Sequence, residues 1–183
     1  MVKRMQIEEM PIPGVKLITG KISEDIRGLF FKPFSSRDLL TFGVEFNPKE
    51  VFYSISRNNV IRGMHFQRPP NEQAKIVTVI KGEITDVVLD LRKKSNHYGK
   101  IACTDLSERN RKSILIPEGV AHGFIGRNFE NIVLYLTDSD YSRENEDGIK
   151  FDTFGYDWGV TDPVISQRDS GFINFEDFIS PFE

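Results

Sequence analysis

The chain has 183 residues, with 24 Lys and Arg residues against 27 Asp and Glu residues and a formal net charge of -3. This near-balance argues against nucleic-acid binding, which needs a basic surplus, but it is compatible with a small anionic ligand that a few arginines can hold. Cys103 is the only cysteine, and there is neither a signal-peptide core nor an apolar run of about 20 residues, which together favour one cytoplasmic, disulfide-free domain over residues 1–183 with no membrane span.

The hydrophobic pattern along the chain is mostly that of strands. Residues 36–42 form the only helical pattern, and Ser36 is expected to cap its first turn. A β-branched strand at 76–80 precedes a turn at 81–83 and a partly alternating strand at 84–91. Three further strands are expected at 113–117, 123–126 and 131–137. Turn signals recur at intervals of roughly ten residues, which favours a sandwich or barrel of antiparallel strands.

The last part of the chain, from Phe151 onward, is irregular and rich in Asp, Phe and Gly. Its aromatic side chains need burial, so we expect a folded wrap around the barrel and not a disordered tail. These side chains belong to Phe151, Phe154, Tyr156, Trp158, Phe172 and Phe175.

The chain has three histidines. His97 lies in a polar turn and is expected at the surface. His65 and His122 lie on expected strands or strand edges, from which their side chains can point into a barrel. Taken alone, each is more typical of a hydrogen-bonded core histidine than of a functional group.

A metal site is not expected, although part of the pattern is typical of one. The spacing Pro117-x-Gly119-x-x-His122 resembles the second half of the metal-binding cupin signature. The first half needs two histidines separated by one residue, and here Phe66 and Gln67 follow His65. Two histidines make a poor site for a divalent metal, which takes three or more protein ligands. The pattern therefore supports a double-stranded β-helix without a metal.

Several longer motifs occur in a fixed order over most of the chain. They are Asp25-Ile26-Arg27-Gly28, Arg62-Gly63-Met64-His65-Phe66-Gln67, Lys75-Ile76-Val77, Lys81-Gly82-Glu83, Asp86-Val87-Val88-Leu89-Asp90-Leu91-Arg92, Ile116-Pro117-Glu118-Gly119-Val120-Ala121-His122-Gly123-Phe124, Asp157-Trp158 and Ile165-Ser166-Gln167-Arg168-Asp169. This series resembles the dTDP-4-dehydrorhamnose 3,5-epimerase family from about Gly14 to Asp169. The second and sixth segments are distinctive together.

The resemblance implies an all-β, cupin-type jelly roll with one or two short helices, built as a homodimer. It implies an isomerase that acts on a nucleotide-linked 4-keto-6-deoxysugar without a metal or redox cofactor. The family's base matches His65, its orienting carboxylate Asp169, its acid Tyr135, and its lysine near the sugar carbonyl Lys75. Positions that line the ligand match Arg27, Arg62, His122, Glu146 and Arg168, with lysine common in the family at the last.

The chemistry explains why such an enzyme needs these groups. A 4-keto group acidifies the C–H bonds at C3 and C5, because the carbanion delocalises as an enolate. A base with a pKa near neutrality removes a proton from one face, and a neutral phenol returns one to the other. A lysine stabilises the enolate oxygen.

Simpler interpretations of the same residues remain open. Tyr135 is typical of packing in a strand, and Asp169 is typical of a backbone acceptor in a turn. Lys75 is also typical of an edge strand, where lysine discourages aggregation.

Three positions depart from the family's pattern. Lys32 stands where the family commonly has glutamate, Glu50-Val51-Phe52 stands where it has Gln-Asp-Asn, and Leu136 stands where lysine or arginine often follows the tyrosine. In the family, the first two positions contact the nucleotide end of the ligand. One hypothesis is therefore that this protein prefers a nucleotide other than thymidine, or a sugar other than the rhamnose precursor.

Three alternatives to a 3,5-epimerase stay open. The first is an epimerase that inverts only C3 or only C5. The second is a non-catalytic jelly roll that binds a sugar nucleotide. A metal cupin enzyme is the third, and it is opposed by the missing ligands of the first motif.

Overall fold

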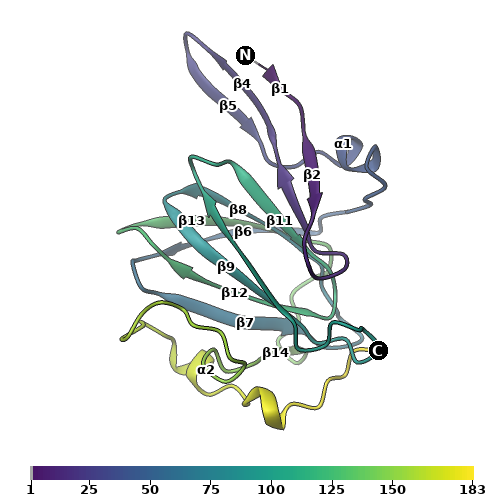
Figure 1. Ribbon diagram of the computed structural model, residues 1–183. Helices are drawn as coiled ribbons and strands as arrows, with labels where there is room; N and C mark the ends of the chain where they lie inside the picture. Colours follow the sequence, from purple (N-terminus) through teal and green to yellow (C-terminus); the bar gives the residue numbers. More distant parts are fainter. Residues whose placement is uncertain (1) are drawn as a thin grey trace.

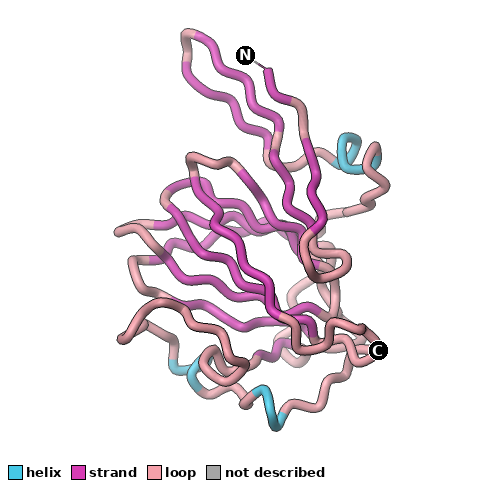
Figure 2. Tube along the Cα trace, in the orientation of Figure 1, coloured by secondary structure: helices cyan, strands magenta, loops and turns pink. Residues whose placement is uncertain are grey.

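A computed structural model describes residues 2–183, and strands dominate it (Figures 1 and 2). The strands are β1 (Val2–Lys3), β2 (Gln6–Glu9), β3 (Lys16–Thr19), β4 (Lys21–Asp25), β5 (Gly28–Lys32), β6 (Glu50–Ser56), β7 (Ile61–Gln67), β8 (Lys75–Lys81), β9 (Glu83–Asp90), β10 (Ile101–Ser107), β11 (Lys112–Ile116), β12 (Val120–Gly126), β13 (Asn131–Thr137) and β14 (Glu146–Gly148). All five strands expected from the sequence are present, and β13 has the predicted bounds.

Two antiparallel sheets face each other. One has the order β2-β3-β11-β8-β13-β6 and the other the order β10-β9-β12-β7-β14. The apolar core between them includes Val77 and Val79 from β8 and Ile84 and Val88 from β9, all fully or almost fully buried. Two facing sheets with antiparallel strands confirm the predicted all-β jelly roll.

The turn between β8 and β9 shows why the Lys-Gly-Glu motif needs its glycine. Gly82 has φ +83°, and a Cβ there would lie 2.4 Å from the carbonyl oxygen of Glu130. A larger residue would be both strained and obstructed at this position. The turn thereby connects two strands of different sheets, with β8 in one and β9 in the other.

The helices differ from the prediction in two respects. Helix α1 spans Ser36–Leu40, and its N-cap is Ser35, whose Oγ accepts a hydrogen bond from the Asp38 N–H. The prediction of Ser36 as the cap was therefore wrong by one residue. The resemblance allowed a second short helix but did not place it. That helix, α2 (Gln167–Ser170), is a single turn, which is too short to show helical periodicity in the sequence. A 3₁₀ turn, η1, spans Phe175–Asp177.

The C-terminal segment wraps the outer face of the second sheet, below β7 and β14 in Figure 1. Phe154 and Trp158 are buried there, and the other four aromatic residues of the predicted set are half-buried. The indole N–H of Trp158 donates to the carbonyl oxygen of Phe151 at 2.8 Å. The segment is thus folded, as expected.

Strands β4 and β5 form an arm that projects away from the two main sheets, with β1 beside it (Figure 1). Ile26 at its tip and Leu29 and Phe30 along β5 are exposed. Among the described elements, no helix has the length and apolarity needed to cross a membrane.

Candidate active site

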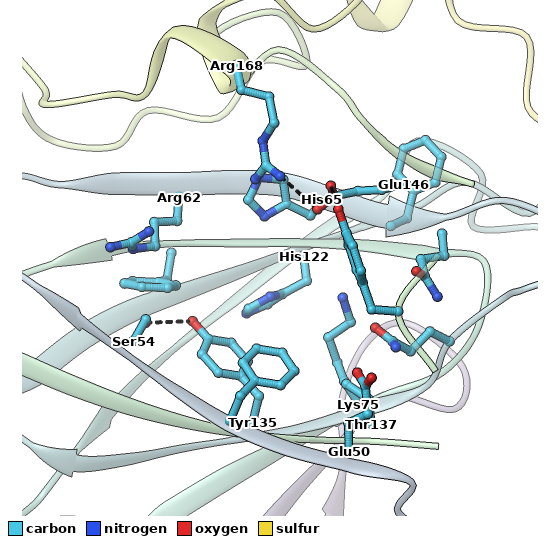
Figure 3. A pocket seen from close by; sticks show the side chains of 16 residues that line it. Glu50, Ser54, Arg62, His65, Lys75, His122, Tyr135, Thr137, Glu146 and Arg168 are labelled. Atoms are coloured by element: carbon cyan, nitrogen blue, oxygen red, sulfur yellow. Dashed lines mark hydrogen bonds and ion pairs between the residues drawn. The ribbon is translucent and has the colours of Figure 1, made fainter. Parts of the chain in front are cut away.

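A pocket of about 220 Å³ lies between the two sheets (Figure 3). It is lined by Glu50, Phe52, Ser54, Arg62, His65, Phe66, Gln67, Gln73, Lys75, His122, Phe124, Tyr135, Thr137, Tyr141, Glu146 and Arg168. Lys75 and Tyr135 extend from β8 and β13 of one sheet, and His65 and His122 extend from β7 and β12 of the other. The pocket therefore has a wall from each sheet.

The Arg-Gly-x-His motif of β7 holds the histidine's partner in place. Gly63 has φ +122°, and a Cβ there would lie 2.5 Å from the Cα of Gly123 on the neighbouring strand. Its N–H donates to Asp169 Oδ2 at 3.0 Å, and the same oxygen lies 3.0 Å from His65 Nε2. Only glycine allows this close approach to Gly123, while the backbone N–H at the same position holds the carboxylate beside the imidazole.

Opposing effects set the charge of this pair. Burial lowers the pKa of His65, while Asp169 raises it and the nearby cations Arg168 and Lys75 lower it further. Although burial raises the pKa of Asp169, hydrogen bonds from His65, the Gly63 N–H and Ser166 hold it well below its usual range. The pair at neutral pH is therefore a neutral imidazole beside a carboxylate.

Arg168 contacts three members of the site. Its guanidinium lies 3.0 Å from His65 Nε2, 3.1 Å from Asp169 Oδ1 and 2.8 Å from Glu146 Oε1. If Nε2 of the neutral imidazole donates to Asp169, then Nδ1 is the free, basic nitrogen. If Nε2 instead accepts from Arg168, then Nδ1 carries the proton and is not basic. The arginine and the carboxylate thus favour opposite tautomers of His65.

Tyr135 lies on the opposite wall and is buried. It is directly across from Phe52 on β6, and the two rings stack with centroids 4.9 Å apart. Its hydroxyl lies 3.3 Å from Ser54 Oγ. Burial raises the pKa of Tyr135 above its ordinary value, so the phenol carries its proton at neutral pH.

Lys75 begins β8, which lies between β11 and β13, so the interpretation of Lys75 as an edge-strand lysine was wrong. Its side chain is buried and points into the pocket (Figure 3). Burial lowers the pKa of Lys75 to about 8, against the attraction of the Asp86 carboxylate. It is across from Thr137, which is in turn across from Glu50, so the three form one row.

His122 is a buried, hydrogen-bonded histidine whose Nε2 lies 2.7 Å from Asp86 Oδ2. Burial raises the pKa of Asp86, against the attraction of His122 and Lys75. The other carboxylate oxygen of Asp86 is buried and has no hydrogen-bond partner among residues 2–183. Sequence reasoning missed Asp86, although a carboxylate inside the alternating strand 84–91 was a usable signal.

The structure brings together most of the residues predicted for the site. His65, Lys75, Tyr135, Arg62, His122, Glu146 and Arg168 line the pocket, and Asp169 lies directly behind His65. Arg27 and Lys32 do not reach it, since both lie on the projecting arm, where Arg27 is exposed and forms a salt bridge with Asp25 at 2.6 Å. Pocket residues that were not predicted include Ser54, Gln73, Thr137 and Tyr141. Among residues 2–183, no group of three or more His, Cys, Asp or Glu side chains is arranged to hold a metal ion.

Comparison with known proteins identifies the family. A profile for dTDP-4-dehydrorhamnose 3,5-epimerase matches residues 9–177. The enzyme of that name from Mycobacterium tuberculosis is 35% identical over 179 residues, covering 94% of this chain and 89% of the relative. A dTDP-4-dehydrorhamnose 3-epimerase from Streptomyces niveus is 33% identical over 168 residues, covering 90% and 81%.

The crystal structure of the Bacillus anthracis dTDP-4-dehydrorhamnose 3,5-epimerase with TDP and PPi bound superimposes with a TM-score of 0.91. It is 32% identical, and the match covers 94% of this chain and all of that one. Fold and pocket define a cupin-type jelly roll of the isomerase class, specifically a carbohydrate epimerase. The chain belongs to the dTDP-4-dehydrorhamnose 3,5-epimerase family.

Proposed function

We propose that the protein inverts C3 and C5 of dTDP-4-dehydrorhamnose, the nucleotide-linked 4-keto-6-deoxysugar after which its relatives are named. One observation carries the proposal: a half-buried histidine, backed by a buried carboxylate, and a buried tyrosine face the same pocket from opposite sheets. A sugar ring between them would present one face to His65 and the other to Tyr135. That arrangement suits inversion, in which a proton leaves one face and another arrives on the opposite face.

In this mechanism Nδ1 of His65 removes the proton beside the ketone. Asp169 holds the tautomer by accepting from Nε2 and stabilises the imidazolium that forms. The ammonium of Lys75 stabilises the enolate oxygen, an effect strengthened by its burial. Tyr135 then gives its proton to the carbon from the other side. Arg62 and Arg168, both exposed at the pocket, supply positive charge for the diphosphate.

Proton NMR in deuterated water tests the proposal directly. With dTDP-4-dehydrorhamnose as the ligand, both C3 and C5 are expected to take up deuterium and invert. Exchange at one carbon only would favour the single-centre alternative, which the Streptomyces relative's name represents. The same assay with a UDP-linked sugar tests the hypothesis, based on Lys32, Val51 and Phe52, that thymidine is not the preferred nucleotide. If the protein binds these ligands but exchanges no proton, the non-catalytic alternative is favoured. Location in the cytoplasm stays a prediction.

The pH dependence of kcat/KM follows from two pocket groups. His65 must be neutral, so activity falls as pH drops through a pKa that burial holds below its usual value. Lys75 must be charged, so activity also falls as pH rises through about 8. We expect a bell-shaped profile, measured by initial rates at low substrate concentration.

A Lys75→Arg variant provides the matched comparison for the alkaline limb. Arginine keeps its charge above pH 12, so the variant should be slower but should lose the limb near pH 8. An unchanged alkaline limb in this variant would assign that pKa to a different group.

We further propose a homodimer in which each subunit's arm completes the other's site. Arg27 and Lys32 cannot serve their own pocket from the arm, whose apolar residues Ile26, Leu29 and Phe30 are exposed. Strand β6, at the edge of its sheet, also exposes Val51 and Tyr53. A free edge and exposed apolar side chains both favour pairing with a second copy.

A heterodimer of His65→Asn and Arg27→Ala subunits tests this arrangement. If Arg27 acts across the interface, one of the two sites contains both an intact His65 and an intact Arg27, so the purified heterodimer should have about half the native activity. Each homodimeric variant alone should be impaired. A heterodimer as inactive as its parents would mean that Arg27 serves its own subunit, and a monomer in sedimentation would exclude the dimer.

A further inference from the structure

Each inversion leaves the two catalytic groups in the wrong protonation state for the next. His65 ends with the proton it removed, and Tyr135 ends as a phenolate. The imidazolium faces a pocket open to water, with about a quarter of its side chain exposed. Tyr135 is only 8% exposed, so the return of its proton is the harder step. This question rests on the roles proposed above for His65 and Tyr135.

Tyr135 borders the pocket, and among the described side chains one is hydrogen-bonded to its hydroxyl. Phe52 covers one face of the ring in a near-parallel stack, with an interplanar angle of 16°. His122 approaches the ring at 6.4 Å in an edge-on arrangement. Within the described residues, the only hydrogen-bonding partner of the phenolic oxygen is Ser54 Oγ, at 3.3 Å. A proton that comes from the protein side must therefore pass through Ser54.

The strand register explains this contact. Tyr135 on β13 is directly across from Phe52 on β6, and Ser54 lies two residues farther along β6 on the same face. Diagonal neighbours of this kind lie within reach of a long aromatic side chain. Strand β6 is the edge strand of its sheet, and Ser54 is half-buried and lines the pocket. Ser54 therefore joins a buried phenol to the pocket's solvent.

We propose that Ser54 is a proton relay that restores Tyr135 after each inversion. The Oγ–H proton passes to the phenolate oxygen while Oγ takes a proton from a pocket water, so serine stays neutral. The proton that His65 removed returns to solvent, and the number of protons on the enzyme is unchanged over the cycle.

Neighbouring groups support this assignment. Burial raises the pKa of Tyr135, and the positive charge of Arg62 opposes that rise, which favours the phenolate until it is reprotonated. The other nearby serine, Ser56, is buried and its Oγ accepts from Arg62 Nε at 2.8 Å. Ser56 is thus held by the arginine and does not contact the phenol.

Single-turnover and steady-state measurements on Ser54 variants separate a relay from a structural role. Tyr135 starts protonated, so the first inversion with enzyme in excess should keep its rate within about twofold in Ser54→Ala and Ser54→Val. The steady-state kcat should fall about tenfold, with KM little changed, because reprotonation becomes limiting. Valine fills the space of the hydroxyl, so a replacing water cannot take over the relay. If two carbons are inverted, singly inverted product should accumulate.

Ser54→Thr is the matched control, since it keeps the hydroxyl and suits a strand, and it should retain most of the steady-state rate. In a Tyr135→Phe background, Ser54→Val should cause no further loss. Unchanged steady-state turnover in Ser54→Val would overturn the relay, as would an equal loss in the first turnover. A native enzyme that inverts no carbon would instead overturn the proposed function, and the relay with it.

Discussion

Replacing His65 with asparagine is expected to abolish deuterium uptake at every carbon that the native enzyme labels. Asparagine is similar in shape and polarity but is not a base at neutral pH. His122, the other histidine that lines the pocket, is buried and hydrogen-bonded to Asp86, so it is poorly placed to act as the base instead of His65. A positioned base contributes a factor of about 100 to 10,000, and the exchange rate, followed by proton NMR, should fall by at least the lower figure.

His97→Asn is the matched control for this experiment. His97 lies in a turn outside the pocket, and its substitution should leave both exchange and inversion at native rates. Near-native exchange in the His65 variant, with the control intact, would refute the assignment of His65 as the base.

Replacing Tyr135 with phenylalanine should separate proton removal from inversion. His65, Asp169 and Lys75 are all retained, so the enolate still forms and some exchange should persist from the His65 face. Net inversion should fall by about 100-fold or more, because the neutral acid on the opposite wall is lost. Exchange and inversion can be measured in the same NMR time course.

Phe52→Leu tests whether any change comes from packing alone. It removes the ring that stacks on Tyr135 but leaves the phenol and its contact with Ser54. This variant should retain much more inversion than Tyr135→Phe. If the tyrosine variant inverted at the native rate, another acid would have to serve that face.

The strands could be predicted to different degrees, and their burial explains why. Strands β8, β11 and β13 are apolar runs in the larger sheet and were recognisable from composition. Strand β6 exposes most of its apolar and aromatic residues and was missed, as was the arm, whose strands are mostly exposed. A pattern of buried residues predicts a strand only where the strand is buried.

The members of the site come from strands that are distant in sequence. His65 on β7 meets Asp169 on α2 only in the folded chain, where the Gly63 N–H also donates to the Asp169 carboxylate. Without the family resemblance, an aspartate in a one-turn helix gives no sign of this contact. The resemblance supplied it. Ser54, which no motif marked, and the contact of Asp86 with His122, which the motif beginning at Asp86 did not reveal, became visible only in the folded chain.

Strand β6 alternates between two roles along its length. Its inward residues Phe52 and Ser54 contact the phenol of Tyr135, and its outward residues Val51 and Tyr53 are exposed on the surface proposed for pairing. A partner subunit that binds Val51 and Tyr53 would therefore also stabilise the positions of Phe52 and Ser54. The specific activity of such an enzyme should depend on its own concentration and should decline on dilution below the dissociation constant of the dimer, with the substrate slowing that decline because it binds the assembled form.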